Sequence, residues 1–340
     1  MIRIAVVGAG HWGPHLIRNF HNQQESTVVC VADLDPLRLQ EISARYPEMR
    51  TTRIPEEAVQ AANVDAVVVA TPTTTHHPLA KLALESGKHV LVEKPLASSA
   101  AQGQELCDLA AAQNITLMVG HVFVFNAGVR YVKNYLASGK LGRVFYISMI
   151  RTNLGPVRMD VNAAWDLATH DLSIASYWLE KEPISASAIG GTWINPGLED
   201  AIFANLRYPE DILVNLQVSW LNPRKTRDIT LVGDTQMLVL DDMNSVEPVR
   251  IYDKGIASER VTPQFTDTYA SFRASIREGD ITLPRVPVGE PLKAECQHFL
   301  ECIAYGKEPI TGGREGLKVV RTLEAIDRSI RAGGRAEPVR

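Results

Sequence analysis

The sequence predicts an α/β protein with an N-terminal Rossmann domain, built on a doubly wound parallel sheet, and a C-terminal α+β domain with a large open, mainly antiparallel sheet. In about the first 120 residues, short Val/Ile/Ala-rich runs alternate with amphipathic stretches, which is typical of βα units. After Asn126, apolar and polar residues alternate as in strands with one buried and one solvated face. We therefore predict two domains, residues 1–122 and residues 123–340.

The first domain is predicted from runs that are too short for helices and are separated by helical patterns. Several of these helices have a proline in the first turn, where its missing N–H does no harm. The expected strands are Ile4–Val7, Val28–Ala32, Ala66–Ala70, His89–Val92 and Thr116–Val119, and the expected helices are Pro36–Arg45, Pro55–Ala61, Pro78–Ser86 and Ser98–Gln113.

The second domain is predicted from longer alternating segments, which indicate an open antiparallel sheet, and from two late helical patterns. The expected strands are Arg143–Arg151, Ser185–Ile194, Ala201–Tyr208, Ile212–Trp220, Asp228–Val232 and Met237–Leu240, and the expected helices are Pro291–Tyr305 and Gly316–Ile330.

Composition excludes several classes of partner. The 340 residues carry a formal net charge of −4, so there is no broad basic field for nucleic acid or an anionic membrane. No run is apolar enough to span a bilayer, and the chain opens on a strand pattern without a signal peptide, so we expect a cytoplasmic protein. The four cysteines fall in strand and helix patterns and predict reduced core thiols. Cys296, His298 and Cys302 cluster in sequence but lack a fourth ligand, so we predict no metal.

A glycine-rich motif stands between the first strand and a helix. It reads Gly8-Ala9-Gly10-His11-Trp12-Gly13. In this context the first glycine allows the tight turn, the second lets a pyrophosphate approach the backbone and the third permits close packing of helix on strand. The N–H groups at the start of the helix would hold the phosphates. We therefore predict a dinucleotide cofactor, with His11 and Trp12 among the residues that bind it.

Asp33, at the end of the second strand, lies where a carboxylate would accept hydrogen bonds from the adenosine ribose. The same carboxylate would repel a 2′-phosphate, so NAD is favoured over NADP. Arg38 is close enough in sequence to reach a 2′-phosphate instead, and this alternative stays open.

Two further segments resemble the family of glucose-fructose oxidoreductase, inositol dehydrogenase and related dehydrogenases (Gfo/Idh/MocA). One contains Ala70-Thr71-Pro72 with His76, and Gly87-Lys88-His89-Val90-Leu91-Val92-Glu93-Lys94-Pro95-Leu96-Ala97; the other is Trp165-Asp166-Leu167-Ala168-Thr169-His170-Asp171. In that family the lysine of the Glu-Lys-Pro segment lies beside the nicotinamide and the substrate, which implies this position for Lys94. The resemblance also implies cofactor contacts from Thr71, Pro72, His76 and Glu93.

The residue types suit the oxidation of an alcohol by NAD. Histidine titrates near neutrality, so His170 is the expected acid/base for the hydroxyl proton. The Lys94 ammonium would stabilise developing alkoxide charge and relay the proton, and Asp166, which shares a helical face with His170, would orient the substrate or the histidine. We predict Lys94, Asp166 and His170 as catalytic and substrate-binding residues.

The polar segment from Arg151 to Asn162 leads into this second signature. Arg158 would be a planar donor for anionic oxygens, and Asn162 a further substrate contact. The segment is similar to that of the family branch that oxidises the 3-hydroxyl of UDP-N-acetylglucosamine or its uronate, which implies such a nucleotide sugar as substrate. The alternative, an arginine that pairs with Asp160 or another acid, carries equal weight.

Two other functions stay open: dehydrogenation of a free sugar or polyol such as inositol, and NAD binding without turnover in a sensor protein. The set of Lys94, Asp166 and His170 argues against the sensor, which needs no proton acceptor. Family members often associate through the open sheet, so we expect a homodimer or homotetramer that uses this sheet.

Overall fold

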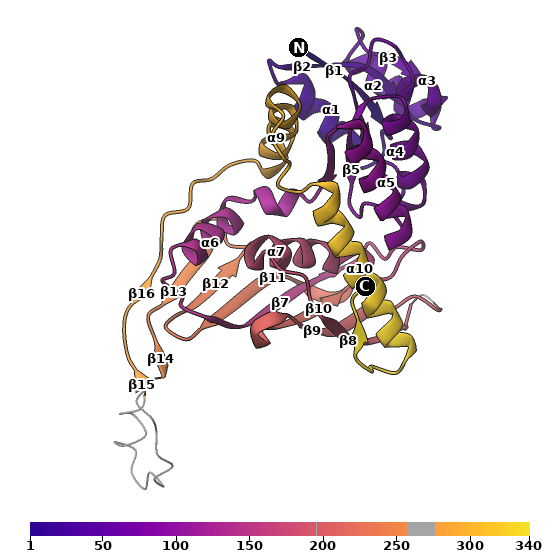
Figure 1. Cartoon of the computed structure of the whole chain (residues 1–340). Helices are drawn as coiled ribbons and strands as arrows, with labels where there is room; N and C mark the ends of the chain where they lie inside the picture. The colour runs from indigo at the N-terminus through magenta and orange to yellow at the C-terminus, as the bar shows by residue number, and fades with distance from the viewer. Residues whose placement is uncertain (195, 257–275) are drawn as a thin grey trace, which may run out of the picture. The chain divides into compact units, whose positions relative to one another are not determined.

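The computed structural model describes residues 1–194, 196–256 and 276–340. By their contacts the residues group into two units (Figure 1): a first unit of Met1–Phe125 with Gly289–Glu324, and a second unit of Asn126–Val288 with Ala325–Arg340. The predicted functional division after residue 122 stays a prediction. The sequence pattern did not indicate that the late segment 289–324 groups with the first unit.

The first unit is built on a six-stranded parallel sheet in the order β3-β2-β1-β4-β5-β6. This order is that of a doubly wound nucleotide-binding fold, with the chain reversing direction along the sheet between β1 and β4. The strands are β1 (Ile2–Val7), β2 (Ser26–Ala32), β3 (Arg50–Thr52), β4 (Ala66–Val69), β5 (His89–Glu93) and β6 (Leu117–Gly120). The helices are α1 (Gly13–His21), α2 (Pro36–Arg45), α3 (Pro55–Val59), α4 (His76–Glu85), α5 (Ala100–Gln113) and α9 (Pro291–Tyr305), with short 3₁₀ turns η1 (Thr73–Thr75) and η2 (Val122–Phe125).

The central strand β4 is buried along its whole length, as a parallel strand covered on both faces must be. All of β4, Ala66–Val69, is inaccessible to solvent, which accounts for its unbroken Val/Ala composition. Side chains fix the helix starts: the Asp35 carboxylate accepts the Leu37 N–H at 2.9 Å, and the Ser99 hydroxyl accepts the Gln102 N–H at 3.3 Å. These caps set α2 and α5 at the carboxyl edge of the sheet.

The second unit is built on a nine-stranded mixed sheet in the order β16-β13-β12-β11-β7-β10-β9-β8-β17. Its strands are β7 (Val144–Leu154), β8 (Ser185–Gly191), β9 (Ala201–Arg207), β10 (Leu213–Ser219), β11 (Leu221–Gly233), β12 (Met237–Asp241), β13 (Val249–Tyr252), β16 (Ile281–Thr282) and β17 (Glu337–Pro338), and β14 (Gly255–Ile256) pairs with β15 (Ile276–Arg277) in a separate sheet. The other elements are α6 (Ala127–Ala137), a π-helical turn η3 (Ala164–Ala168), α7 (Thr169–Leu179), a 3₁₀ turn η4 (Pro209–Asp211) and the end of α10 (Gly313–Arg331).

In the part of the chain that the structure describes, helices lie on one face of this sheet and leave the other open (Figure 1). α6 and α7 pack over the strands (Figure 1), and α7 is buried on most of its surface. Along β9, buried Ile202, Ala204 and Leu206 alternate with exposed neighbours, so alternate residues face the helices. The sheet is mainly antiparallel, as predicted, but β10 runs parallel to β7.

The differences from the predicted elements have physical reasons. The three-residue strand β3 has exposed or half-buried polar side chains, so it carries no apolar signal. α4 begins at His76, two residues before the proline that marked its predicted start, because the first helical turn tolerates proline. The strand β7 continues three residues beyond its predicted end at Arg151, so Thr152, Asn153 and Leu154 belong to the strand and not to the following loop. Strands β13 to β17 are short and escaped prediction.

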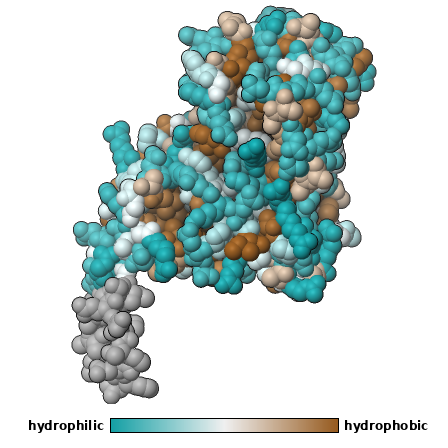
Figure 2. Space-filling view, in the orientation of Figure 1, coloured by the Kyte–Doolittle hydropathy of each residue, from teal (hydrophilic) through white to brown (hydrophobic). Residues whose placement is uncertain are grey.

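The four cysteines are free and buried, as predicted for core thiols. The Cys302 Sγ lies 3.4 Å from His298 Nε2, which accepts the Ile310 N–H at 3.0 Å and is therefore occupied. Among the helices of the described residues, none is long and apolar enough to cross a membrane. On the face that Figure 2 shows, hydrophobic residues form scattered patches on a largely hydrophilic surface.

Candidate active site

The glycine motif forms the turn from β1 into α1. Gly8 has φ of +102°, and a Cβ on it would lie 2.4 Å from the Ala70 carbonyl oxygen. A Cβ on Gly13 would lie 2.0 Å from the Gly8 carbonyl oxygen, whereas one on Gly10 would meet the end of the Arg38 side chain at 3.2 Å. Gly8 and Gly13 are therefore required by the turn itself. Gly10 keeps its side of the turn open for a ligand.

Asp33 braces this turn from the end of β2. Its Oδ2 accepts the Ala9 N–H at 2.6 Å, and its Oδ1 accepts the Asp35 N–H at 2.9 Å. Arg38 lies 3.7 Å from the same Oδ2. Each carboxylate oxygen has a second lone pair, so Asp33 retains the capacity to accept a ribose hydroxyl. His11 is exposed and Trp12 half-buried in the same turn.

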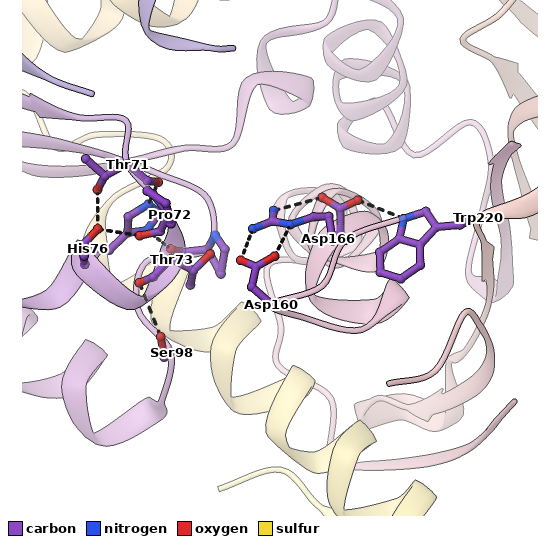
Figure 3. Close-up of polar contacts among 11 residues, drawn as sticks. Thr71, Pro72, Thr73, His76, Ser98, Asp160, Asp166 and Trp220 are labelled. Carbon is purple, nitrogen blue, oxygen red and sulfur yellow. Dashed lines mark hydrogen bonds and ion pairs between the residues drawn. The ribbon is translucent and has the colours of Figure 1, made fainter. Parts of the chain in front are cut away.

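His76 links two loops at the carboxyl ends of β4 and β5. Its Nδ1 lies 2.7 Å from the Pro95 carbonyl oxygen and its Nε2 lies 2.9 Å from the Thr71 carbonyl oxygen, and the side chain is 1% exposed. Figure 3 shows His76 against Thr71, with Pro72 at the turn. His76 therefore packs beneath the loops, and its contacts tie the Thr71 loop to the loop of Lys94.

Lys94 follows the last residue of β5, and a cis bond joins it to Pro95. The Glu93 carboxylate accepts the Lys94 backbone N–H at 3.2 Å, and a Cβ on Gly120 would lie 3.1 Å from that carboxylate. Burial raises the pKa of Glu93 to about 7, against the opposing effects of the Lys94 charge and the Trp12 indole. The Trp12 N–H interacts with Glu93 although its geometry falls short of a full hydrogen bond.

His121 lies one residue beyond β6, at the same edge of the sheet. It is 1% exposed, and burial, followed by the charge of Lys94, lowers its pKa to about 3. The imidazole is therefore neutral at neutral pH. Our sequence analysis did not select His121, although a histidine directly after a buried strand at the ligand-binding edge was a signal for it.

In the second unit, Asp166 and His170 lie on successive helical segments. Asp166 belongs to the π-helical turn η3 and His170 is the second residue of α7. Such turns are rare and frequently occur at functional sites. Asp166 is held from two sides, because its Oδ2 accepts the Trp220 indole N–H at 3.1 Å and its Oδ1 lies 3.4 Å from Arg158 Nη1 (Figure 3). Trp220, which is fully buried, was missed by the sequence analysis.

Arg158 also forms a two-point ion pair with Asp160, with its Nε 2.9 Å from Oδ1 and its Nη2 2.5 Å from Oδ2. This pair matches the alternative that the sequence left open. The arginine side chain is 29% exposed and is therefore partly accessible to solvent. Its contact with a substrate stays a prediction.

Asn162 caps the helical segment that carries Asp166. Its Oδ1 accepts the Ala164 and Trp165 N–H groups at 3.1 and 3.2 Å, and its Nδ2 donates to Glu199 at 2.9 Å and to Asp327 at 3.0 Å. The Asp327 carboxylate in addition accepts the Trp165 indole N–H at 2.7 Å. These contacts use the amide fully and favour a structural role over the predicted substrate contact.

The predicted residues thus form two groups. The first unit brings the glycine turn, Asp33 and the loops of Thr71, Pro72, His76, Glu93 and Lys94 to the carboxyl edge of one parallel sheet, and the second unit brings Arg158 to Asp166 in the segment that leads into His170. Their roles as catalytic and binding residues stay predictions.

The first group is suited to hold NAD. The turn leaves no room for side chains at Gly8 and Gly13, places the start of α1 beside an open Gly10 and carries an acidic residue at the end of β2. These features match what a pyrophosphate and an adenosine ribose require. Within the described residues no three His, Cys, Asp or Glu side chains gather as a metal site would require.

Comparisons with known proteins agree with this geometry. A family model described as an oxidoreductase family with an NAD-binding Rossmann fold matches residues 2–121, and the GFO/IDH/MocA C-terminal domain matches residues 129–239. The UDP-N-acetylglucosamine 3-dehydrogenase of Acidithiobacillus ferrooxidans is 24% identical over 323 residues, which cover 94% of each chain. The scyllo-inositol 2-dehydrogenase (NAD(+)) of Bacillus subtilis is 24% identical over 322 residues, which cover 91% of this chain and 88% of that enzyme.

Among solved structures, the WlbA dehydrogenase of Bordetella pertussis in complex with NADH and UDP-GlcNAcA is similar at a TM-score of 0.82 and 23% identity, with coverage of 100% of this chain and 98% of that one. At this identity the likeness shows the fold alone. The two matched domain models together span most of the chain and agree with the Rossmann sheet, the glycine turn and the Glu93-Lys94-Pro95 segment. The chain belongs to the Gfo/Idh/MocA family and is an NAD-dependent dehydrogenase that acts on CH–OH groups.

Proposed function

We propose that this dehydrogenase oxidises a ring hydroxyl of a nucleotide-linked sugar, UDP-N-acetylglucosamine or its uronate, at C3 to give a keto sugar. The observation that carries the proposal is the position of Arg158, which lies 3.4 Å from Asp166 and is partly exposed to solvent. A guanidinium next to the candidate catalytic carboxylate can bind the anionic oxygens of a diphosphate or a uronate. The similarity to the Acidithiobacillus enzyme over almost the whole chain supports it.

We assign the roles as follows. The glycine turn and Asp33 would hold NAD, which would supply the acceptor for the hydride of the ring carbon. His170 takes the hydroxyl proton, since an imidazole nitrogen is an effective general base. Asp166 is fixed by Trp220 and Arg158, so it can orient a substrate hydroxyl or the His170 ring. Lys94 stabilises the negative charge that develops on the hydroxyl oxygen.

The first unit holds the cofactor in this proposal. The N–H groups of the glycine turn bind the phosphates, and Asp33 accepts hydrogen bonds from the adenosine ribose. His76 is buried and acts through its carbonyl contacts, so it positions the Thr71 and Lys94 loops and does not itself touch the nicotinamide. This differs from the direct cofactor contact that the family resemblance implied.

A free polyol such as inositol is the second candidate substrate. The inositol dehydrogenase of Bacillus subtilis is as similar as the nucleotide-sugar enzyme, at 24% identity. The contacts of Arg158 with Asp160 and Asp166 also favour a free polyol. An arginine whose charge is already neutralised by two carboxylates attracts an anionic diphosphate less strongly, whereas an uncharged polyol does not require that attraction.

We further propose that the chain forms a homodimer or homotetramer through the open face of the nine-stranded sheet. Neighbouring strands place apolar side chains on this face: Ile189 of β8 lies opposite Phe203 of β9, and Leu213 of β10 lies beside Tyr146 of β7. All four are at least 45% exposed. A large exposed apolar surface is typical of a subunit contact, and sedimentation of the purified chain would measure the oligomeric state.

The substrate is tested by absorbance at the reduced-nicotinamide band after mixing protein and NAD with UDP-sugars, free sugars and inositols. A rise with UDP-N-acetylglucosamine or its uronate, lost in Arg158→Ala with that substrate, is the expected result. A rise with inositol or a free sugar and not with UDP-sugars would transfer the proposal to the second candidate. NADH that copurifies with the protein, with no rise on mixing, would show that the cofactor stays bound and is regenerated by another substrate.

A further inference from the structure

Asp327 lies in the part of α10 that belongs to the second unit, and the function proposed above gives it no role. Its two carboxylate oxygens each accept a hydrogen bond from the segment that precedes Asp166. Oδ1 accepts from Asn162 Nδ2 at 3.0 Å, and Oδ2 accepts the Trp165 indole N–H at 2.7 Å. Burial raises the pKa of Asp327, and these two hydrogen bonds oppose the rise because they favour the ionised form. One carboxylate of α10 therefore holds two residues of the Asp166 segment.

A second carboxylate completes the contacts of Asn162. The Asn162 Nδ2 also donates to Glu199 Oε2 at 2.9 Å, and the Ala163 N–H donates to the Glu199 backbone carbonyl oxygen at 2.9 Å. A side-chain amide has two N–H groups, so each carboxylate receives one of them. The Asn162 Oδ1 caps the following turn by accepting the N–H groups of Ala164 and Trp165. The amide is thus fixed in one orientation at the start of η3.

These contacts reach Asp166 through the backbone of η3. Asp166 directly follows Trp165, and its N–H donates to the Asn162 carbonyl oxygen at 3.3 Å. Because a π-helical turn contains more residues than an α-helical turn, the direction of the Asp166 side chain depends on which of the two geometries the segment adopts. In the observed geometry Asp166 Oδ2 accepts the Trp220 indole N–H at 3.1 Å (Figure 3). A shift of residues 162–165 would move Asp166 away from Trp220.

We propose that Asp327 is a positioning residue for Asp166: through Asn162 and Trp165 it holds the π-helical turn in the geometry that places Asp166 beside Trp220 and four positions before His170. The inference rests on the proposed function only for the part that Asp166 plays in the reaction. It assigns to α10, a helix outside both signatures of the candidate site, the alignment of the Asp166 and His170 segment.

A purely structural role for the same bonds makes a different prediction. If Asp327 only attaches α10 to the rest of the second unit, the loss of a bond lowers the free energy of unfolding. The folded protein then keeps the geometry of Asp166 and its turnover. Positioning requires instead that the environment of Asp166 changes and that turnover falls in protein that is still folded.

Two substitutions break the contact between Asp327 and Trp165 from its two sides. Asp327→Asn keeps the size, but only one terminal atom of the amide accepts hydrogen bonds, so one of the two donors loses its partner. Trp165→Phe keeps an aromatic ring and removes the donor. On a substrate that the parent chain oxidises, we expect each variant to lower kcat by about tenfold or more, because a displaced catalytic group slows the chemical step.

Three comparisons make this kinetic test specific. NAD affinity should stay within a few fold in both variants, because the glycine turn and Asp33 supply the cofactor contacts in the proposed function. The double variant should lose less than the product of the two single losses, since the two residues share one bond. Asp211→Asn is the matched control, the same change at a carboxylate that is 87% exposed and pairs with Arg207, and its kcat should equal that of the parent chain.

The position of Asp166 is read without activity by NMR of the indole N–H groups in the full chain labelled with ¹⁵N-tryptophan. Trp220 reports on Asp166, because its N–H donates to that carboxylate. Trp178, whose N–H donates to the Val129 carbonyl oxygen at 2.9 Å, reports on α7. Trp220→Phe and Trp178→Phe assign the two signals. We expect Asp327→Asn and Trp165→Phe to move the Trp220 signal and to leave the Trp178 signal in place.

An unmoved Trp220 signal in both variants, or parent-like turnover in both, would overturn the proposal and leave Asp327 with a structural role. Equal movement of the Trp220 and Trp178 signals would show a general change of the fold and would overturn it as well. If the Trp220 signal moves as expected but the parent chain oxidises no alcohol, the proposed function fails and the positioning of Asp166 stands. Thermal melting identifies a variant that does not fold, and the other variant then decides alone.

Discussion

Arg151 and Asp171 form a buried two-point ion pair: Arg151 Nη2 lies 2.7 Å and Nε 3.0 Å from Asp171 Oδ1. The arginine is 4% exposed and the aspartate 2%. The pair joins the sheet strand β7 to the first turn of α7, directly after His170. In the register of the sheet, Arg151 lies opposite Arg227 of β11, whose guanidinium pairs with Asp242 at 3.0 Å. This arrangement fixes the helix start that carries the candidate base.

From this pair we predict that Asp171→Asn lowers the free energy of unfolding by about 3–5 kcal/mol, because a buried arginine loses its carboxylate. Arg151→Met should cost a similar amount, and the double variant Arg151→Met with Asp171→Leu should recover part of the loss. Urea denaturation followed by circular dichroism measures all three. A loss below about 1 kcal/mol in both single variants would show that the pair does not anchor α7.

The glycine turn makes a contrasting pair of predictions for NAD binding. A Cβ on Gly13 would collide with the Gly8 carbonyl oxygen at 2.0 Å, so Gly13→Ala should distort the turn and lower both stability and NAD affinity. Gly10→Ala meets a flexible arginine end at 3.2 Å, so it should keep the melting temperature and lower NAD affinity by about tenfold or more, since the methyl group faces the phosphates. Calorimetric titration with NAD gives the affinities. Unchanged affinity in Gly10→Ala would remove that glycine from the phosphate site.

Much of the first unit was predictable because its strands are buried on both faces and its helices carry clear start signals such as Asp35 and Pro36. The short strand β3 was not, since Arg50 and the two threonines after it show no apolar pattern. The grouping of Gly289–Glu324 with the first unit was also out of reach. Contacts between segments so distant in sequence depend on tertiary packing, which local periodicity does not encode.

The site was predictable where a short motif carries it, as in the glycine turn and the Lys94 and His170 signatures. Residues that act through burial were missed. In the sequence, Trp220 is only the last residue of an alternating strand. Its hydrogen bond to Asp166 joins residues 54 positions apart, which a local pattern does not predict. Glu295 of α9 lies in an ordinary amphipathic helix pattern, where a glutamate predicts an exposed position, but the structure buries it completely. Arg158 and Asn162 were selected as polar residues near a motif. In the structure both form hydrogen bonds with carboxylates of the protein, Arg158 with Asp160 and Asn162 with Asp327.

Asp33 gives a prediction for cofactor preference. Asp33→Asn keeps an oxygen that can accept the Ala9 N–H, which lies 2.6 Å away in the parent chain, but removes the charge that repels a 2′-phosphate. We expect the ratio of kcat/KM for NAD over NADP to fall by about tenfold or more, with the melting temperature little changed. Asp33→Ala, which also removes the brace, should weaken NAD binding. Kinetics with both cofactors measure this, and an unchanged ratio in both variants would show that another group rejects NADP.

The pair of Arg3 and Asp65 gives a prediction for stability against pH. The hydrogen bond from Arg3, 2.6 Å between Nη2 and Oδ1, is the largest of the effects that lower the pKa of Asp65 from 3.8 to about 2. Because the folded pKa lies below the unfolded one, the stabilisation is present above about pH 4 and is lost as pH falls towards 2. Asp65→Asn should therefore melt lower than the parent chain at pH 7, and the difference should shrink between pH 4 and pH 2.

The effect is small because the pair is partly exposed and its attraction is screened by solvent. Thermal melts at matched ionic strength measure it, and raising the salt concentration should reduce the difference at pH 7. A difference that stayed constant from pH 7 to pH 2 would mean that Asp65 acts through its shape and not through its charge.

The assignment of Lys94 and His170 gives the last prediction. Lys94→Ala and His170→Ala should each lower kcat by about 100-fold or more, because each removes a group that acts on the hydroxyl proton or its oxygen. NAD affinity should stay within a few fold, since the glycine turn and Asp33 supply the cofactor contacts in this proposal. His21→Ala is the matched control, because His21 is the last residue of α1, at the opposite end of this helix from the glycine turn, and its Nδ1 lies 3.7 Å from Glu48. Its turnover should equal that of the parent chain. Parent-like turnover in either site variant, on a substrate that the parent oxidises, would remove that residue from the mechanism, whereas an equal fall in all three variants would point to a general effect on folding.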